Sequence, residues 1–155
     1  MPDKADTNSK PQTLTLQQAL DLAVEHHQAG DLPKAENIYQ QILQSDPNQP
    51  QALHLLGMIA YQSGDNEKAI ELIEKSLAIY PDYAEAHSSL GNAMQALGRL
   101  DEALGYYQYA VNLKPEYAAA YNNIAVISRE MGKRDEVIPY LKKAIELSPN
   151  YAEAH

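Results

Sequence analysis

Apolar residues recur at intervals of three and four along most of the chain, with polar residues between them. Leu90, Met94 and Leu97 form one such stripe, which Gly98 follows directly, and a second stripe begins a few residues later. Because this spacing places the apolar side chains on one face of a helix, each stripe predicts an amphipathic α-helix. The glycine between the stripes indicates a turn, so the predicted local element is a helix–turn–helix hairpin.

The hairpin pattern occurs four times with a period of 34 residues. Two sets of residues mark the period, namely the glycines Gly30, Gly64, Gly98 and Gly132 and the prolines Pro47, Pro81, Pro115 and Pro149. A fixed period in this range is typical of stacked helical repeats, so we predict an all-α solenoid. The predicted array covers residues 14–151, in the units 16–49, 50–83, 84–117 and 118–151.

The second helix of each unit is expected to begin just after the glycine and to end at the proline. Its first turn holds proline or an acid, at Pro33, Glu67, Asp101 and Asp135. Both residue types suit a helix start, since proline needs no N–H partner there and an acid complements the helix dipole. Pro139 lies inside the second helix of the fourth unit, where the third unit has Gly105. We therefore expect this position to face solvent, and any kink there to carry no function.

Small residues occupy corresponding places on the two helices of a hairpin. The first helices carry Ala23, Gly57, Gly91 and Ala125, and the second helices carry Ala35, Ala69 and Ala103. Small side chains let two helices approach closely, so these positions are expected to set the crossing of each hairpin. A glycine inside a helix costs about 1 kcal/mol relative to alanine, which close packing is expected to offset.

This 34-residue pattern resembles the tetratricopeptide repeat over almost the whole chain, most closely in AHSSLGNAMQALGRLDEALGYYQYAVNLKPEYA, residues 86–118. The resemblance implies a right-handed α-solenoid whose concave face is lined by the first helices and receives a peptide or partner segment. Carried over position by position, the lining residues are Gln51, His54, Leu55, Met58 and Tyr61 in the second unit, Glu85, Ser88, Ser89, Asn92 and Gln95 in the third, and Ala119, Asn122, Asn123, Val126 and Arg129 in the fourth.

The groove implied by the resemblance changes character along its length. Leu55, Met58 and Tyr61 make an apolar and aromatic stretch, and an amide and hydroxyl stretch follows that includes Asn92 and Asn123. Amide side chains both donate and accept, so such a row suits the backbone of an extended peptide, although it also suits plain solvent exposure. The row resembles the asparagine ladder of O-GlcNAc transferases, with only Asn123 at a directly matching position. The lining positions hold no lysine, which disfavours the carboxylate clamp of chaperone-binding family members.

The charge of the chain limits its partners. The net charge is −9, which disfavours nucleic acid and anionic membranes. Residues 16–117 hold 14 acidic and 5 basic residues, whereas residues 118–151 hold 4 and 5. The acidic part favours a basic partner segment, with solubility as the plain alternative. The polar residues 1–13 lack the features of a signal peptide and are expected to be a disordered tail, so the cytoplasm is the default location.

No residue pattern in the chain predicts catalysis or a cofactor. There is no cysteine, which rules out a disulfide framework and a thiolate zinc site. His54 and His87 lie on neighbouring first helices, but no further metal ligands accompany them, so no metal site is predicted. Phosphate loops, nucleophile elbows and zinc-hydrolase motifs are absent from the sequence as well. We therefore predict a protein that is not an enzyme.

Three functions are compatible with these patterns. The first is a protein-binding scaffold. The second is the substrate-recruiting arm of a larger enzyme, because LTLQQALDLAVEHHQAGDLPKAENIYQQIL, residues 14–43, resembles bacterial repeat proteins with later O-GlcNAc-transferase-like, sulfotransferase-like or methyltransferase-like domains. The third is self-assembly. Residues 152–155 repeat the opening of the third unit, so we expect a truncated fifth unit, an open apolar side along residues 135–147, and self-association through that end.

Overall fold

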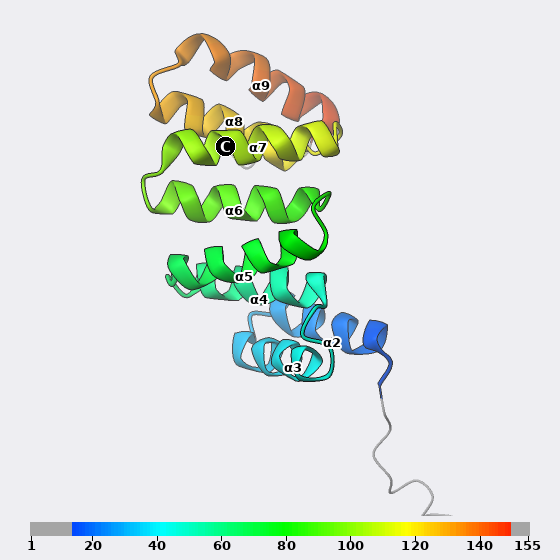
Figure 1. Ribbon diagram of the computed structural model, residues 1–155. Helices are drawn as coiled ribbons and strands as arrows, with labels where there is room; N and C mark the ends of the chain where they lie inside the picture. The colour runs from blue at the N-terminus through cyan, green and yellow to red at the C-terminus, as the bar shows by residue number, and fades with distance from the viewer. Residues whose placement is uncertain (1–13, 150–155) are drawn as a thin grey trace, which may run out of the picture.

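The computed structural model describes residues 14–149, which form a stack of paired α-helices (Figure 1). The helices are α2 (Leu16–Gln28), α3 (Leu32–Ser45), α4 (Pro50–Gln62), α5 (Asn66–Ile79), α6 (Ala84–Ala96), α7 (Leu100–Leu113), α8 (Ala118–Glu130) and α9 (Arg134–Leu147). This part of the chain has no β-strand, and the predicted all-α solenoid of hairpins is confirmed. The expected tail at 1–13 and the expected fifth unit at 152–155 lie outside the described residues.

Each hairpin turns at a glycine with a left-handed backbone. Gly64 has φ 89°, its N–H donates to the carbonyl of Tyr61, and the N–H of Asp65 donates to the carbonyl of Ala60. This pair of bonds is the Schellman motif, which satisfies the last carbonyls of α4 and is far easier for glycine than for any residue with a Cβ. Asp65 then caps the next helix, because its carboxylate accepts the N–H of Lys68 at 3.1 Å. One glycine therefore ends a helix and places the cap of the next.

The two helices of a hairpin approach most closely at the small residues. A methyl group added to Gly57 would lie 3.2 Å from the carbonyl oxygen of Ala69, and one added to Gly91 would lie 2.6 Å from ring carbon Cε1 of Tyr107. Tyr107 is fully buried, so its ring lies directly over the space that Gly91 leaves. The expected close packing at these positions is present in the structure.

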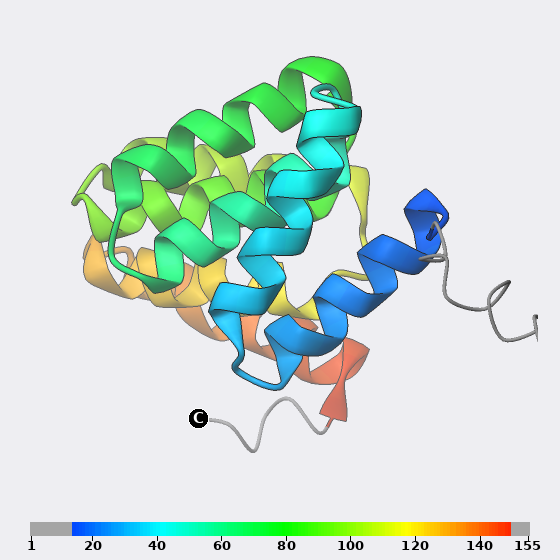
Figure 2. The same ribbon diagram turned by 90° about the horizontal axis from the view of Figure 1, so that it is seen from below.

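Contacts run along the stack from each hairpin to the next, with α3 against α4, α5 against α6 and α7 against α8. One core cluster joins the first two hairpins, and a larger one, which includes Ile73, Leu90, Met94 and Ile124, joins the last three. Seen end-on, successive hairpins are rotated relative to one another, which gives the stack its curvature (Figure 2).

The last described hairpin is the least enclosed. In α9 only Ala144 is buried, while Ile138 is 62% and Ile145 43% exposed. Pro139 is exposed inside this helix, and Gly105 is exposed at the corresponding position of α7, as the sequence predicts for a tolerant surface site. None of the described helices is long and apolar enough to cross a membrane.

Candidate binding groove

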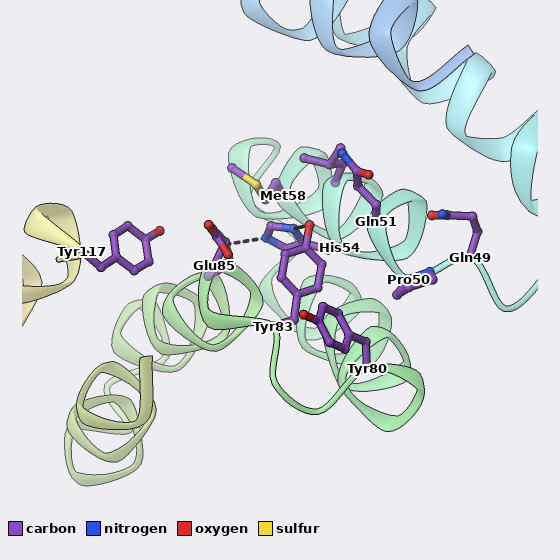
Figure 3. Close-up of a pocket in the computed structure, with 11 residues that line it drawn as sticks. Gln49, Pro50, Gln51, His54, Met58, Tyr80, Tyr83, Glu85 and Tyr117 are labelled. Carbon is purple, nitrogen blue, oxygen red and sulfur yellow. Dashed lines mark hydrogen bonds between the residues drawn. The ribbon is translucent and has the colours of Figure 1, made fainter. Parts of the chain in front are cut away.

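A cavity of about 640 Å³ opens beside the first helices α4 and α6 (Figure 3). Tyrosine rings form much of its wall, so we call it the tyrosine pocket. Its lining residues are Gln49, Pro50, Gln51, His54, Leu55, Met58, Tyr80, Tyr83, Glu85, Ser89 and Tyr117. Tyr80 and Tyr83 come from the connection between α5 and α6, and Tyr117 comes from the start of α8. Residues of α4, of α6 and at the N-cap of α8 therefore contribute to one cavity.

His54 is the buried centre of this region, with only 3% of its surface exposed. One ring nitrogen, Nδ1, lies 2.9 Å from the hydroxyl of Tyr83, and the other, Nε2, lies 2.8 Å from Oγ of Ser89. Burial lowers the pKa of His54 from 6.5 to about 4, partly offset by Glu85, so the ring is neutral at neutral pH. Both nitrogens are engaged, and His54 positions Tyr83 and Ser89 more than it offers itself to a ligand.

Glu85 brings a carboxylate to the pocket wall. Nζ of Lys114 donates to its Oε1 at 2.9 Å, and the same ammonium lies 5.1 Å from the centre of the Tyr117 ring. Burial acts to raise the pKa of Glu85, but the hydrogen bond and charge of Lys114 outweigh it, and the pKa is lowered. The carboxylate is therefore ionised at neutral pH.

A polar row continues from the pocket along α6 and α8. The hydroxyl of Tyr107 lies 2.7 Å from Oδ1 of Asn92 and 2.8 Å from Oε1 of Gln95. Nδ2 of Asn123 lies 3.5 Å from the same oxygen of Asn92 and 3.4 Å from Oγ of Ser88. The amides therefore bond first to one another and to Tyr107, which leaves Oδ1 of Asn123 and the amide hydrogens of Asn92 as the row's spare capacity.

The structure divides the residues expected to line the groove. Six of them line the tyrosine pocket, namely Gln51, His54, Leu55, Met58, Glu85 and Ser89. A smaller recess of about 90 Å³ beside it is lined in part by Met58, Tyr61, Ser89 and Asn92. The others, namely Ser88, Gln95, Ala119, Asn122, Asn123, Val126 and Arg129, line neither hollow. Ser88 is buried, and Oδ1 of Asn122 is buried without a hydrogen-bond partner among the described residues.

Sequence reasoning missed the pocket residues that lie at the joints between units. Tyr83 and Tyr117 are the last residues of their units, and Gln49 and Pro50 stand at the preceding joint. A signal was present, because the two tyrosines are separated by the same 34 residues as the prolines. That spacing alone does not show that the rings fold back over the first helices.

The described residues contain no group of three or more histidine, cysteine or acidic side chains placed to hold a metal ion. Of the two histidines on neighbouring first helices, His54 has both ring nitrogens hydrogen-bonded, whereas Nδ1 of His87 is buried without a hydrogen-bond partner among the described residues. His87 bonds through Nε2 to the carbonyl of Pro81 at 2.8 Å and packs against the rings of Tyr106 and Tyr109.

Hairpins stacked around a shared concave groove define a helical-repeat protein. Tetratricopeptide repeat models match residues 26–93 and 82–150, so together they account for most of the chain. The chain belongs to the tetratricopeptide repeat family. The comparisons give no support to the narrower resemblance to O-GlcNAc-transferase arms.

Solved structures of similar shape agree with this fold. A crystal structure of MamA is 27% identical, with a TM-score of 0.73 over 97% of this chain and 84% of that one. TTC0263, a thermophilic TPR protein in Thermus thermophilus, is 26% identical, with a TM-score of 0.79 over 86% of this chain and 74% of that one. MamA 41-end from Desulfovibrio magneticus RS-1 is 20% identical with a TM-score of 0.73, over 86% of this chain and 76% of that one, and supports the fold alone. A search of curated proteins found no significant match.

Proposed function

We propose that this array is a non-enzymatic scaffold that binds an extended segment of a partner protein along α4, α6 and α8. The observation that carries the proposal is the continuity of the two hollows, because Met58 and Ser89 line both the tyrosine pocket and the smaller recess. An apolar hollow with a few polar groups at its edge is the usual form of a binding site. The polar row of Asn92 and Asn123 extends the same face towards α8.

The spare amide groups suit a peptide backbone. Oδ1 of Asn123 can accept a backbone N–H, and the amide hydrogens of Asn92 can donate to a backbone carbonyl. Such bonds do not depend on the peptide's side chains, so they provide affinity with little sequence preference. Side-chain preference then falls to the tyrosine pocket.

The charge of the array favours a basic segment. The chain carries −9 in total, and Glu85 is the charged residue that lines the tyrosine pocket. A negative field raises the rate at which positively charged segments meet the groove, and this effect weakens as salt is added. We therefore expect binding to weaken with increasing ionic strength.

The test begins with a display library of random extended peptides selected against the full chain. Binding of the selected peptides is then measured by fluorescence anisotropy on wild type and on Asn123→Ala. One lost hydrogen bond, worth about 0.5–1.5 kcal/mol, predicts an affinity about two- to tenfold lower. Asn112→Ala is the matched control, because Asn112 is an exposed asparagine on the second helix α7.

Helicity measured by circular dichroism must be equal in both variants for the comparison to hold. Equal loss of affinity in both, or none in either, would refute the role of the polar row. Asn92→Ala with Asn123→Ala should weaken binding further. That pair also removes a partner of the Tyr107 hydroxyl, so its stability needs a separate measurement.

Self-assembly is a second candidate, favoured by the exposed apolar residues at the two ends of the stack. Leu16 and Leu22 border a hollow of about 520 Å³ between α2 and α3, and Ile138 and Ile145 are exposed on α9. Pairing of such surfaces between chains would bury apolar area. Light scattering over a concentration range tests this, and a monomer at every concentration would exclude it.

A further inference from the structure

The walls of the tyrosine pocket suit a positively charged group. Tyr80, Tyr83 and Tyr117 supply aromatic rings, and the faces of such rings attract cations. Tyr80 is 50% exposed, so its ring is accessible from solvent. In Figure 3 the carboxylate of Glu85 lies between the ring of Tyr117 on one side and the rings of Tyr83 and Tyr80 on the other.

The pocket lining carries no positive charge at neutral pH. Its only acidic or basic side chains are Glu85, which is ionised, and His54, which burial keeps neutral. No lysine or arginine of the described chain belongs to the lining. A cation that enters the pocket therefore meets several rings and one carboxylate, which Lys114, outside the lining, holds at 2.9 Å.

The structure already holds one cation at the edge of this site. The ammonium of Lys114 bonds to Glu85 at 2.9 Å and lies 5.1 Å from the centre of the Tyr117 ring. The side chains of Lys114 and Glu85 are 39% and 43% exposed, so this ion pair contributes little to stability and can be exchanged. Lys114 thus shows what the carboxylate and ring bind, and it competes with any incoming cation.

Among cationic groups, the guanidinium fits these walls better than an ammonium. It is planar, so it stacks on a tyrosine ring, and its N–H groups can grip a carboxylate through two bonds at once. It is also more weakly hydrated than an ammonium, which favours its transfer to an aromatic wall.

We propose that the tyrosine pocket binds the guanidinium of an arginine side chain carried by the partner segment, with Glu85 as its carboxylate. The proposal rests on the proposed function, because the arginine belongs to the segment held along the groove. The arginine site adds a preference for one side chain of the bound segment, whereas the polar row recognises only its backbone.

The test uses three peptides that differ at one position, acetyl-Gly-Ser-Xaa-Ser-Gly-amide with Xaa as arginine, citrulline or norleucine. Citrulline has nearly the shape of arginine without the charge, and norleucine keeps only the apolar stem. Each peptide is titrated into the full chain and followed by NMR, using the ring signals of the tyrosines. We expect the arginine peptide to bind at least about threefold more tightly than the citrulline peptide, as one cation–π contact requires.

Two variants with opposite expected effects on the affinity for the arginine peptide make the test specific. Glu85→Gln removes the carboxylate and should weaken binding of the arginine peptide by about two- to fivefold. Lys114→Gln removes the competing ammonium and should strengthen it by a similar factor. The matched control is the exposed pair Glu71 and Lys75 on α5, 3.0 Å apart, where Glu71→Gln and Lys75→Gln should change nothing.

The outcomes separate this proposal from the function on which it rests. Equal affinity for the arginine and citrulline peptides, or weaker arginine binding in Lys114→Gln, overturns the arginine site. Library peptides that bind along the polar row and lack arginine would also overturn it, while the proposed function stands. If neither the library peptides nor these three bind, both proposals fail.

Discussion

Replacing Gly91 by alanine tests whether the closest helix approach sets the geometry of the hairpins. The added methyl would lie 2.6 Å from Cε1 and 2.8 Å from Cδ1 of Tyr107, well inside contact distance. The ring is fully buried, and its hydroxyl lies within hydrogen-bond distance of Asn92 and Gln95. The ring therefore cannot move aside without losing these contacts, and α6 and α7 must separate instead.

Two effects of opposite sign determine the magnitude. Alanine favours the helix interior by about 1 kcal/mol over glycine. Overpacking a filled core costs about 1–3 kcal/mol, and contacts this short with buried ring carbons call for the upper part of that range. We therefore expect Gly91→Ala to lower the free energy of unfolding by about 2 kcal/mol, taking the two terms together.

Gly105→Ala is the matched control, because Gly105 lies inside α7, is exposed, and has no atom within 4 Å of an added methyl. Only the helix preference acts there, so this variant should gain about 0.5–1 kcal/mol. Urea unfolding followed by circular dichroism compares the two. A stability gain in Gly91→Ala equal to that of Gly105→Ala would refute the view that the close approach requires glycine.

Two further predictions concern buried polar groups. The hydroxyl of Tyr39 is buried without a hydrogen-bond partner among the described residues, so Tyr39→Phe should leave thermal stability unchanged or raise it. The hydroxyl of Tyr107 has two possible acceptors, so Tyr107→Phe should lower the free energy of unfolding by about 1 kcal/mol. A contrary ranking of the two would refute this interpretation. The pKa of His54 is about 4 in the folded chain, against an ordinary value of 6.5 in the unfolded chain. Between these two pH values the unfolded chain therefore binds more protons than the folded chain. The stability contributed by neutral His54 should be complete above pH 6.5 and be lost as the pH falls towards 4, by up to about 3 kcal/mol. His54→Gln should remove this part of the pH dependence in urea unfolding measured between those values, and an unchanged slope would contradict it.

The fold could be predicted because its determinants recur at fixed positions. Gly64 and Gly98 end helices with the same left-handed backbone, and Gly57 and Gly91 lie against Ile73 and Tyr107, which hold the same position in their second helices. Each such residue acts through its own backbone or one neighbouring helix. A pattern of this kind can be recognised in the sequence alone, since the period places equivalent residues in equivalent surroundings.

The candidate site was only partly predictable, because its side chains are arranged by contacts across repeats. Leu55 and Met58 were expected in the groove and line the tyrosine pocket. His54 was expected to line the groove, and it lines the pocket, but its ring is buried between two hydroxyls. Tyr83 and Tyr117 were not predicted, because the sequence does not show in which direction the side chain of a residue at the end of a unit points.

The cross-repeat contacts nevertheless follow a rule that the period implies. Four side-chain hydrogen bonds between neighbouring first helices join residues 35 apart, one more than the repeat, as in His54 with Ser89 and Ser88 with Asn123, whereas Asn92 and Asn123 are 31 apart. Gln95 with Glu130 and His27 with Gln62 obey the same spacing. These bonds connect successive first helices. They occupy donors and acceptors that the sequence pattern alone would leave available to a ligand. A polar residue of the groove is thus available to a partner only to the extent that its neighbours on the adjoining helices leave it unpaired, and this favours the tyrosine pocket over the polar row as the source of specificity.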